Sequence, residues 1–137
     1  RDAGIESEII PGVPSACAAA AAAGIPLTRR LTARRVQFVT GADVTGTLPE
    51  GLNWAALADP GATTVVFMGQ RSFPRLAADL VAHGLAPETP ALLAEAVGRA
   101  EQRLVPATIA TLAALLAEGV SDQPALILYG ALAPPGS

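Results

Sequence analysis

The sequence predicts an α/β fold, with a mixed sheet of about five strands flanked by helices. Three observations predict it. Of the 137 residues, 51% are hydrophobic and only 15% are charged, so the chain can bury a core. Short β-branched or aliphatic runs alternate with helix-forming runs, which is the order expected of helices packed on both faces of a sheet. Glycine and proline separate these runs, as they do between elements of a compact domain.

Two elements are expected before residue 25. Glu6–Ile10 is a candidate short strand, which the following Pro-Gly pair ends. Ala16–Ala23 is nearly pure alanine and is predicted to be a helix, because alanine has the highest helix propensity. Ser15 suits its first turn, and Gly24 suits the position just after its end.

The middle of the chain predicts two strands and one amphipathic helix. Val36–Thr40 and Thr63–Met68 are apolar and β-branched, as strands are. The long connection Gly41–Pro60 contains a short helical stretch at Trp54–Ala58, and long ordered loops often carry function. Ser72–Ala82 has leucines near one face and charged residues elsewhere, which predicts a surface helix.

The last third predicts three more strands and one helix. Pro90–Ala96 fits either a helix or a strand, and its place after a helix and a loop favours a strand. Gln102–Val105 is a short strand, Thr108–Glu118 is a helix, and Ala125–Tyr129 is the last strand. We expect residues 131–137 to form a disordered tail.

The composition excludes several classes of protein. The net charge is −3, and all nine basic residues are arginine, so a dedicated nucleic-acid surface is not expected. One cysteine and one histidine exclude a disulfide framework and a His or multi-Cys metal cluster. No apolar run is long enough to span a membrane. The remaining class is a soluble domain of the cytoplasm, in which Cys17 is a small buried hydrophobe and His83 caps a helix.

The beginning of the chain predicts that it is a piece of a longer protein. Arg1–Ile5 reads RDAGI, which resembles the last turn of a helix ending at Gly4, and the chain does not begin with methionine. The alternative is a processed or tagged terminus.

Glycines follow three of the predicted strands, at Gly41, Gly69 and Gly130. Ligands of open α/β sheets bind beyond the carboxyl ends of strands, where glycine lets the backbone approach a ligand closely. The alternative is that each glycine only makes a turn. The segment Pro11–Ser15 is a further candidate, because it leads into a helix amino terminus.

Arginines cluster in the loop after the alanine helix and could bind carboxylates in a bidentate manner. They are Arg29, Arg30, Arg34 and Arg35. The alternative is a solvated loop. Composition and spacing alone indicate no catalytic group.

Several segments together resemble a known family. They are Ile9–Ala16, Gly24–Thr28, Val39–Gly41, Val66–Gly69, Glu95 with Gln102 and Arg103, and Pro124–Ile127 with Gly130. In this order and spacing they resemble the second domain of the tetrapyrrole methylases, closest to the uroporphyrinogen-III C-methyltransferases. The resemblance implies that residues 1–137 are a carboxy-terminal domain, without the amino-terminal domain that carries the family's Gly-rich loop.

The resemblance implies a function for the longer protein. It would be a homodimer that transfers a methyl group from S-adenosylmethionine to ring carbons of uroporphyrinogen III, giving precorrin-2 and S-adenosylhomocysteine. The cofactor would lie between the two domains, so this chain alone would be inactive. Neither nucleic acid nor a membrane is an implied partner, and no metal is implied.

The resemblance also implies site residues. The cofactor contacts would be Pro14, Ser15, Met68, Ala96, Val97, Tyr129 and Gly130. The substrate contacts would be Arg30, Thr40 and Gly41, with Arg30 facing substrate carboxylates. No catalytic base is assigned in this part of the family's fold.

The chain departs from the family pattern at a few positions, which keeps two alternatives open. Ala42 stands where a histidine is frequent, and Val97 stands where a glycine is common. An apolar segment replaces the basic one after Gly130. One alternative is another corrin-ring methyltransferase, and the other is a non-catalytic binding or dimerisation module. Siroheme and cobalamin synthesis are both open as pathways.

Overall fold

The computed structural model describes residues 2–134, which form nine helices and strands. In chain order they are α1 (Ser15–Ala23), β1 (Arg35–Thr40), α2 (Trp54–Leu57), β2 (Ala62–Phe67), α3 (Phe73–Ala82), β3 (Pro90–Glu95), β4 (Arg103–Thr108), α4 (Ile109–Glu118) and β5 (Ala125–Gly130). The strand interpretation of Pro90–Ala96 is therefore confirmed, and the predicted helices lie within a residue or two of their expected bounds.

The five strands make one mixed sheet in the order β1-β2-β5-β3-β4. β1 and β2 are parallel, and every other neighbouring pair is antiparallel. It follows that β1, β2 and β3 run in one direction, while β4 and β5 run in the other. The carboxyl ends of β1, β2 and β3 therefore share one edge of the sheet with the amino end of β5. The predicted α/β class with a mixed sheet of five strands is confirmed.

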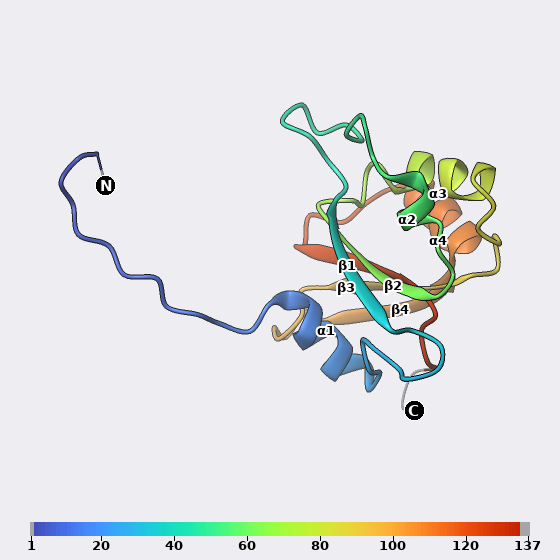
Figure 1. Cartoon of the computed structure of the whole chain (residues 1–137), viewed down its shortest axis with the longest axis horizontal. Coiled ribbons are helices and arrows are strands. Elements are labelled where there is room, and N and C mark those ends of the chain that lie inside the picture. Colours follow the sequence, from blue (N-terminus) through green and yellow to red (C-terminus); the bar gives the residue numbers. More distant parts are fainter. Residues whose placement is uncertain (1, 135–137) are drawn as a thin grey trace.

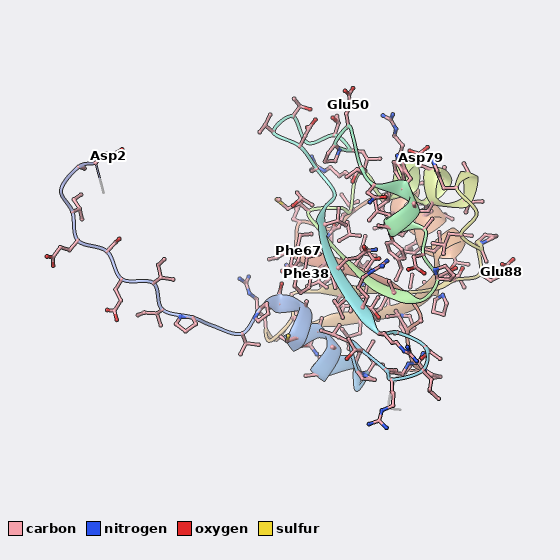
Figure 2. All side chains as sticks on the ribbon, in the orientation of Figure 1. Asp2, Phe38, Glu50, Phe67, Asp79 and Glu88 are labelled. Carbon is pink, nitrogen blue, oxygen red and sulfur yellow. The ribbon has the colours of Figure 1, made fainter. Side chains whose placement is uncertain are left out.

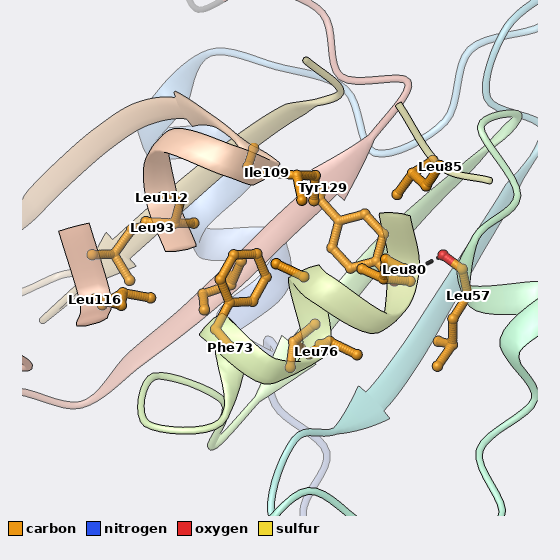
Figure 3. Packing of buried hydrophobic residues seen from close by; sticks show 14 of the residues in the cluster. Leu57, Phe73, Leu76, Leu80, Leu85, Leu93, Ile109, Leu112, Leu116 and Tyr129 are labelled. Atoms are coloured by element: carbon orange, nitrogen blue, oxygen red, sulfur yellow. Dashed lines mark hydrogen bonds between the residues drawn. The ribbon is translucent and has the colours of Figure 1, made fainter. Parts of the chain in front are cut away.

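Helices cover both faces of this sheet (Figure 1). On one face, α1 packs against apolar side chains of β2, β3 and β5 such as Val65, Leu92 and Leu128. On the other face, α2, α3 and α4 build the larger core, in which Phe73, Tyr129 and a set of leucines are fully buried (Figure 3). Burial of these side chains is the main favourable contribution to the stability of the fold.

The alanine helix α1 buries one face and exposes the other. Ala16, Ala19, Ala20 and Ala23 are buried, and their spacing places them on one side of the helix. Cys17 lies on the other side and is exposed, so the prediction of a buried cysteine is wrong. The physical reason is that every side of this helix is small and apolar, so the sequence does not indicate which side meets the sheet.

The helices of the larger core have well-defined ends. α4 begins with a capping box in which Thr108 and Thr111 exchange hydrogen bonds. α3 ends at His83, whose Nδ1 lies 2.7 Å from the carbonyl oxygen of Asp79. The imidazole also stacks on the Trp54 indole, with ring centroids 5.1 Å apart. The prediction that His83 caps a helix is therefore confirmed.

The predicted strand at Glu6–Ile10 is wrong. Residues 4–14 are extended but pair with no strand, and they lead away from the sheet (Figure 1). The isoleucines Ile5, Ile9 and Ile10 are exposed. A strand needs a neighbour for its backbone hydrogen bonds, and the described sheet ends at β1 and β4 without one for this segment. Arg1 lies outside the described residues, and residues 2 and 3 form a turn before Gly4.

The prediction of a disordered tail is wrong for residues 131–134. Residues 131–134 follow β5 on a defined path, and Leu132 and Ala133 are buried in the core beneath α1. Burial of these two apolar side chains stabilises the ordered path of the segment. The Pro- and Gly-rich composition of this end of the chain does not indicate that burial. Residues 135–137 of the expected tail lie outside the described residues.

Candidate functional site

A pocket of about 630 Å³ lies at the edge of the sheet where β1, β2 and β3 end. Its lining comes from these strand ends, the start of α1 and the segment that leads into β5. The lining residues are Ser15, Ala42, Gly46, Phe67, Met68, Gln70, Arg71, Ala94, Ala96, Val97, Arg99, Val120, Ser121, Gln123, Pro124, Ala125 and Leu126. The size and the largely apolar lining with a few polar groups are typical of small-molecule sites.

Four of the predicted cofactor residues meet in this pocket. Ser15 comes from the start of α1, Met68 from the end of β2, and Ala96 with Val97 from the end of β3. Pro14 directly precedes Ser15 as the amino-terminal cap residue of α1. Residues separated by more than eighty positions in the chain are thus brought to one cavity.

Met68 and Ala96 share an unusual backbone conformation. Their φ angles are 53° and 48°, and they are the only residues other than glycine with positive φ in the described part of the chain. Such conformations cost roughly 1–3 kcal/mol each and cluster at binding sites. The Met68 side chain is also 67% exposed at the pocket, although methionine is normally buried. The left-handed backbone distinguishes both strand ends from the rest of the sheet, and the exposed side chain distinguishes Met68 alone, because Ala96 is buried.

Aromatic packing holds the β2 wall of the pocket. Phe67, the last residue of β2, packs edge-on against Phe38 of the neighbouring strand, with ring centroids 5.8 Å apart (Figure 2). This contact fixes an apolar surface beside Met68. The Phe38 ring is itself mostly exposed.

Thr40 and Gly41 lie beside the pocket at the end of β1. The Gly41 amide donates to the Phe67 carbonyl oxygen at 2.7 Å, and the Ser72 hydroxyl donates to the Gly41 carbonyl oxygen. A Cβ on Gly41 would lie 2.7 Å from the Cα of Gly69. Gly41 therefore lets the loops after β1 and β2 touch, which is a structural role next to the site. Thr40 is exposed, and the following Ala42 lines the pocket.

Tyr129 and Gly130 do not reach the pocket. β5 is antiparallel to β2, so its carboxyl end lies at the opposite edge of the sheet, where Gly130 pairs with Thr63. Tyr129 is fully buried in the larger core, and its hydroxyl donates to the Leu57 carbonyl oxygen at 2.9 Å (Figure 3). Burial raises the pKa of Tyr129 to about 12. Grouping these two residues with the other cofactor contacts is not supported by the geometry.

Arg30 lies at the far edge as well. It belongs to the loop between the end of α1 and the start of β1, opposite the pocket. Its carbonyl oxygen accepts a hydrogen bond from Arg34 Nε at 2.7 Å, and neighbouring Arg29 donates to the Ala131 carbonyl oxygen at 2.6 Å. Arg35 pairs with Asp59. This arginine cluster thus ties the loop to nearby backbone, and the structure does not bring Arg30 together with Thr40 and Gly41.

A buried carboxylate supports the floor of the site. Glu95, the last residue of β3, is 5% exposed. It accepts hydrogen bonds from Arg103 Nε at 2.7 Å and from the Ser121 hydroxyl at 2.6 Å. The first is an ion pair and the second a hydrogen bond to a carboxylate, and hydrogen bonds with a charged partner are strong. They fix β4 and the Ser121 segment relative to Ala96, so Glu95 positions two parts of the pocket wall.

The loop after β1 is organised by Asp43. Its carboxylate accepts hydrogen bonds from the hydroxyl and amide of Thr45 at 2.6 and 2.7 Å, and from the amide and hydroxyl of Thr47, both at 3.1 Å. The Thr45 hydroxyl, followed by the Thr45 amide, lowers the pKa of Asp43 to about 2. Ala42 and Gly46, on either side, line the pocket. Asp43 therefore shapes one rim of the site.

This loop should keep its structure in moderately acidic solution. The pKa of Asp43 in the folded loop is lower than its ordinary value of 3.8, so the charged form stabilises the fold. That contribution is complete above the ordinary pKa and is lost as the pH falls towards 2. We expect the Thr45 and Thr47 amide resonances to titrate with a midpoint near pH 2. A midpoint near pH 4 in the NMR titration would contradict the hydrogen-bonded carboxylate.

Neither a metal-binding cluster nor a membrane-spanning helix is found in the described part of the chain. Between residues 2 and 134, no group of three or more His, Cys, Asp or Glu side chains could hold a metal ion. The search for membrane spans over the same residues finds no helix of sufficient length and apolarity. His83 is at the end of α3 and does not line the pocket.

The family model for Tetrapyrrole (Corrin/Porphyrin) Methylases matches residues 1–113. The S-adenosyl-L-methionine-dependent uroporphyrinogen III methyltransferase of Methanosarcina barkeri is 40% identical over 126 residues, which are 92% of this chain and 49% of that protein. The siroheme synthase of Gluconacetobacter diazotrophicus is 43% identical over 129 residues, covering 93% of this chain and 27% of its own length. The chain thus spans about half of one relative and about a quarter of the other.

Solved structures show the same fold. A cobalt precorrin-4 methyltransferase superposes with a TM-score of 0.80 at 26% identity, over 94% of this chain and 54% of that one. The uroporphyrin-III C-methyltransferase of Thermus thermophilus, in complex with S-adenosylhomocysteine, gives a TM-score of 0.73 at 29% identity, with the same coverage. Family model, sequence relatives and fold agree. The chain belongs to the tetrapyrrole (corrin/porphyrin) methylase family.

Proposed function

We propose that this chain is the second half of an S-adenosylmethionine-dependent methyltransferase that methylates uroporphyrinogen III and forms precorrin-2. The observation that carries the proposal is the pocket at the strand ends, where Ser15, Met68, Ala96 and Val97 meet. The identity with the Methanosarcina barkeri methyltransferase supports the substrate. The Thermus thermophilus enzyme in complex with S-adenosylhomocysteine supports the cofactor.

The residues of the pocket fit the cofactor. Its apolar wall of Phe67, Met68 and Leu126 suits the adenosyl group, and the hydroxyls of Ser15 and Ser121 provide hydrogen-bonding groups. When bound, S-adenosylmethionine supplies an electrophilic methyl group for an electron-rich ring carbon. The polarizable Met68 side chain adds a soft contact surface.

This half of the protein contributes positioning rather than acid–base chemistry. Among the described lining residues, the charged side chains are Arg71 and Arg99, which do not act as bases at neutral pH. Holding the cofactor in line with the ring carbon and excluding water can supply a large part of the rate enhancement. A group that removes the ring proton is expected in another part of the protein.

The isolated chain should bind the cofactor product weakly and show no turnover, because it supplies only part of the cofactor cleft. We expect S-adenosylhomocysteine to shift the NMR amide signals of Ser15, Met68 and Val97 with a dissociation constant far above micromolar. Tyr129 and Gly130 should not shift. Submicromolar binding in calorimetry, or detectable methyl transfer by the 137-residue chain, would contradict this.

Activity should require the amino-terminal half of a relative. Joining that half of the Methanosarcina barkeri enzyme to this chain should give methyl transfer from labelled S-adenosylmethionine to uroporphyrinogen III. The unfused halves mixed together serve as the control. A folded fusion that binds S-adenosylhomocysteine but methylates no tetrapyrrole would favour the non-catalytic module.

A second candidate is a methyltransferase acting later on the corrin ring. It is favoured by the TM-score of 0.80 with the cobalt precorrin-4 methyltransferase, which exceeds that of the uroporphyrin enzyme. The higher sequence identity to the uroporphyrinogen enzyme argues against it. Offering both substrates to the fusion distinguishes the two. We also propose that the whole protein is a cytoplasmic homodimer, which its mass in solution and cell fractionation would test.

A further inference from the structure

Two arginines stand at matching positions on the two strand ends that form the pocket. Arg71 follows Met68 by three residues, and Arg99 follows Ala96 by three residues. Met68 and Ala96 are the two residues with left-handed backbone described above. The Arg99 amide donates to the Ala96 carbonyl oxygen at 3.0 Å, and Arg71 directly precedes Ser72, the amino-terminal cap residue of α3. Short turns of defined geometry therefore carry both guanidinium groups.

Neither arginine has a charged partner within residues 2–134. The ion pairs found there use Arg35, Arg75 and Arg103 instead. Both Arg71 and Arg99 line the pocket, and both are largely exposed, so they lie at its open side. Their side chains make no hydrogen bond to a described residue that would hold them away from a ligand.

The rest of the lining does not neutralise these charges. Among the described residues, the lining contains no aspartate or glutamate. Glu95 beneath the floor is committed to Arg103 and Ser121, and Asp43 to the two threonines of its own loop. Asp122 lies between two lining residues but forms no ion pair with either arginine. A chain with net charge −3 thus presents, at one cavity, two cations without a charged partner among the described residues.

The two arginines indicate that the ligand at the mouth of the pocket is negatively charged. S-adenosylmethionine carries a sulfonium, an ammonium and one carboxylate, so it is a net cation and offers only one carboxylate to two arginines. A tetrapyrrole with acetate and propionate side chains is a polyanion. Arginine pairs with carboxylates through two parallel hydrogen bonds and is always protonated. The two positive charges match the carboxylates of the acceptor better than any part of the methyl donor.

We propose that Arg71 and Arg99 bind side-chain carboxylates of the tetrapyrrole at the mouth of the pocket and so select an anionic acceptor. The inference rests on the proposed function and assigns two residues to substrate recognition. In this proposal Arg71 and Arg99, and not Arg30 at the opposite edge of the sheet, bind the substrate carboxylates. The two guanidinium groups come from separate strand ends and contact the acceptor from two sides.

The test uses the stable, fluorescent uroporphyrin III as the probe for the acceptor. Its binding to the 137-residue chain is measured by fluorescence for the wild type, Arg71→Gln, Arg99→Gln and the double variant. We expect each single change to raise the dissociation constant severalfold, and the double change to raise it at least tenfold. The matched control is Arg75→Gln, an arginine of α3 that is 76% exposed and does not line the pocket, and it should bind as the wild type does.

Salt dependence separates an ionic role from a structural one. The wild-type affinity should fall as salt rises from 50 to 300 mM, and the double variant should lose most of that dependence. Coproporphyrin III, which has four carboxylates instead of eight, should bind the wild type more weakly and lose less affinity in the double variant. Thermal melting of each variant checks that the fold is retained.

Each outcome decides the proposal. The proposal is wrong if the double variant binds uroporphyrin as tightly as Arg75→Gln does. It is also wrong if the wild-type chain shows no saturable binding of uroporphyrin. If the double variant instead weakens only S-adenosylhomocysteine binding, the arginines recognise the cofactor carboxylate and the proposal is wrong. Two measurements test the proposed function separately from these results. They are the NMR shifts of the Met68 and Val97 amides on adding S-adenosylhomocysteine, and methyl transfer by the fusion protein.

Discussion

Replacing Gly130 by alanine should destabilise the protein by roughly 3–5 kcal/mol, a large part of the total stability of a domain. Gly130 has φ 120°, a backbone conformation that residues with a side chain rarely adopt. A Cβ there would overlap the carbonyl oxygen of Ala62 and lie 3.1 Å from its carbonyl carbon. These are backbone atoms at the start of β2. The clash is relieved only by moving β5 away from β2 in the centre of the sheet.

Urea denaturation of Gly130→Ala and the wild type measures this effect. Gly84→Ala is the matched control, because Gly84 also has a positive φ of 98° but no atom within 4 Å of the added Cβ. It should cost only the backbone strain, about 1–2 kcal/mol. If the free energy of unfolding falls equally in both variants, the clash with Ala62 does not contribute to the loss of stability. A Gly130→Ala protein of wild-type stability that binds S-adenosylhomocysteine poorly would restore the cofactor role that the resemblance implies.

The difference between Gly130 and the other strand-end glycines shows what the sequence can predict. Gly41, Gly69 and Gly130 each follow an apolar run, and the runs have the same appearance in either strand direction. Direction is decided by the order of strands in the sheet, where β5 lies between β2 and β3 and antiparallel to both. Gly41 and Gly69 therefore lie beside the pocket, while Gly130 lies at the other edge. Strand existence follows from the local pattern, but strand direction does not.

The pocket itself was predictable in part. Ser15, Met68, Ala96 and Val97 were found from their resemblance to a family, and the structure places all four in one cavity. The left-handed backbone at Met68 and Ala96 could not be predicted, because neither residue type favours it. It arises where a strand ends and the chain must turn at once into a loop that lines the pocket.

The sequence contains a signal for Arg71 and Arg99, but a weak one. The local cluster around Arg30 is far more conspicuous, because it places four charges within seven residues. In the structure, members of that cluster bond to backbone oxygens or to Asp59, whereas the two isolated arginines both line the pocket. Their equal spacing after two strand ends was the observable clue, but it has meaning only once those strands are known to be parallel.

Filling the pocket should remove ligand binding without unfolding the chain. Val97 lies in the loop after β3, is partly exposed and lines the cavity. In Val97→Trp, an indole replaces a small side chain and occupies space that the adenosyl group needs. We expect affinity for S-adenosylhomocysteine to fall at least tenfold in the chain, which corresponds to about 1.4 kcal/mol or more. Methyl transfer by the fusion protein should fall by a similar factor when the cofactor is below saturation.

The control for this variant is Val81→Trp, the same substitution on α3 at a position that is 41% exposed and does not line the pocket. Both variants add the same aromatic surface, so a general effect of tryptophan on solubility or stability appears in both. A loss of ligand shifts in Val97→Trp alone, with equal melting temperatures, locates the cofactor at the ends of β2 and β3. Equal binding by the two variants would mean that the cofactor lies outside this pocket, and the roles of Met68 and Ala96 would then be only structural.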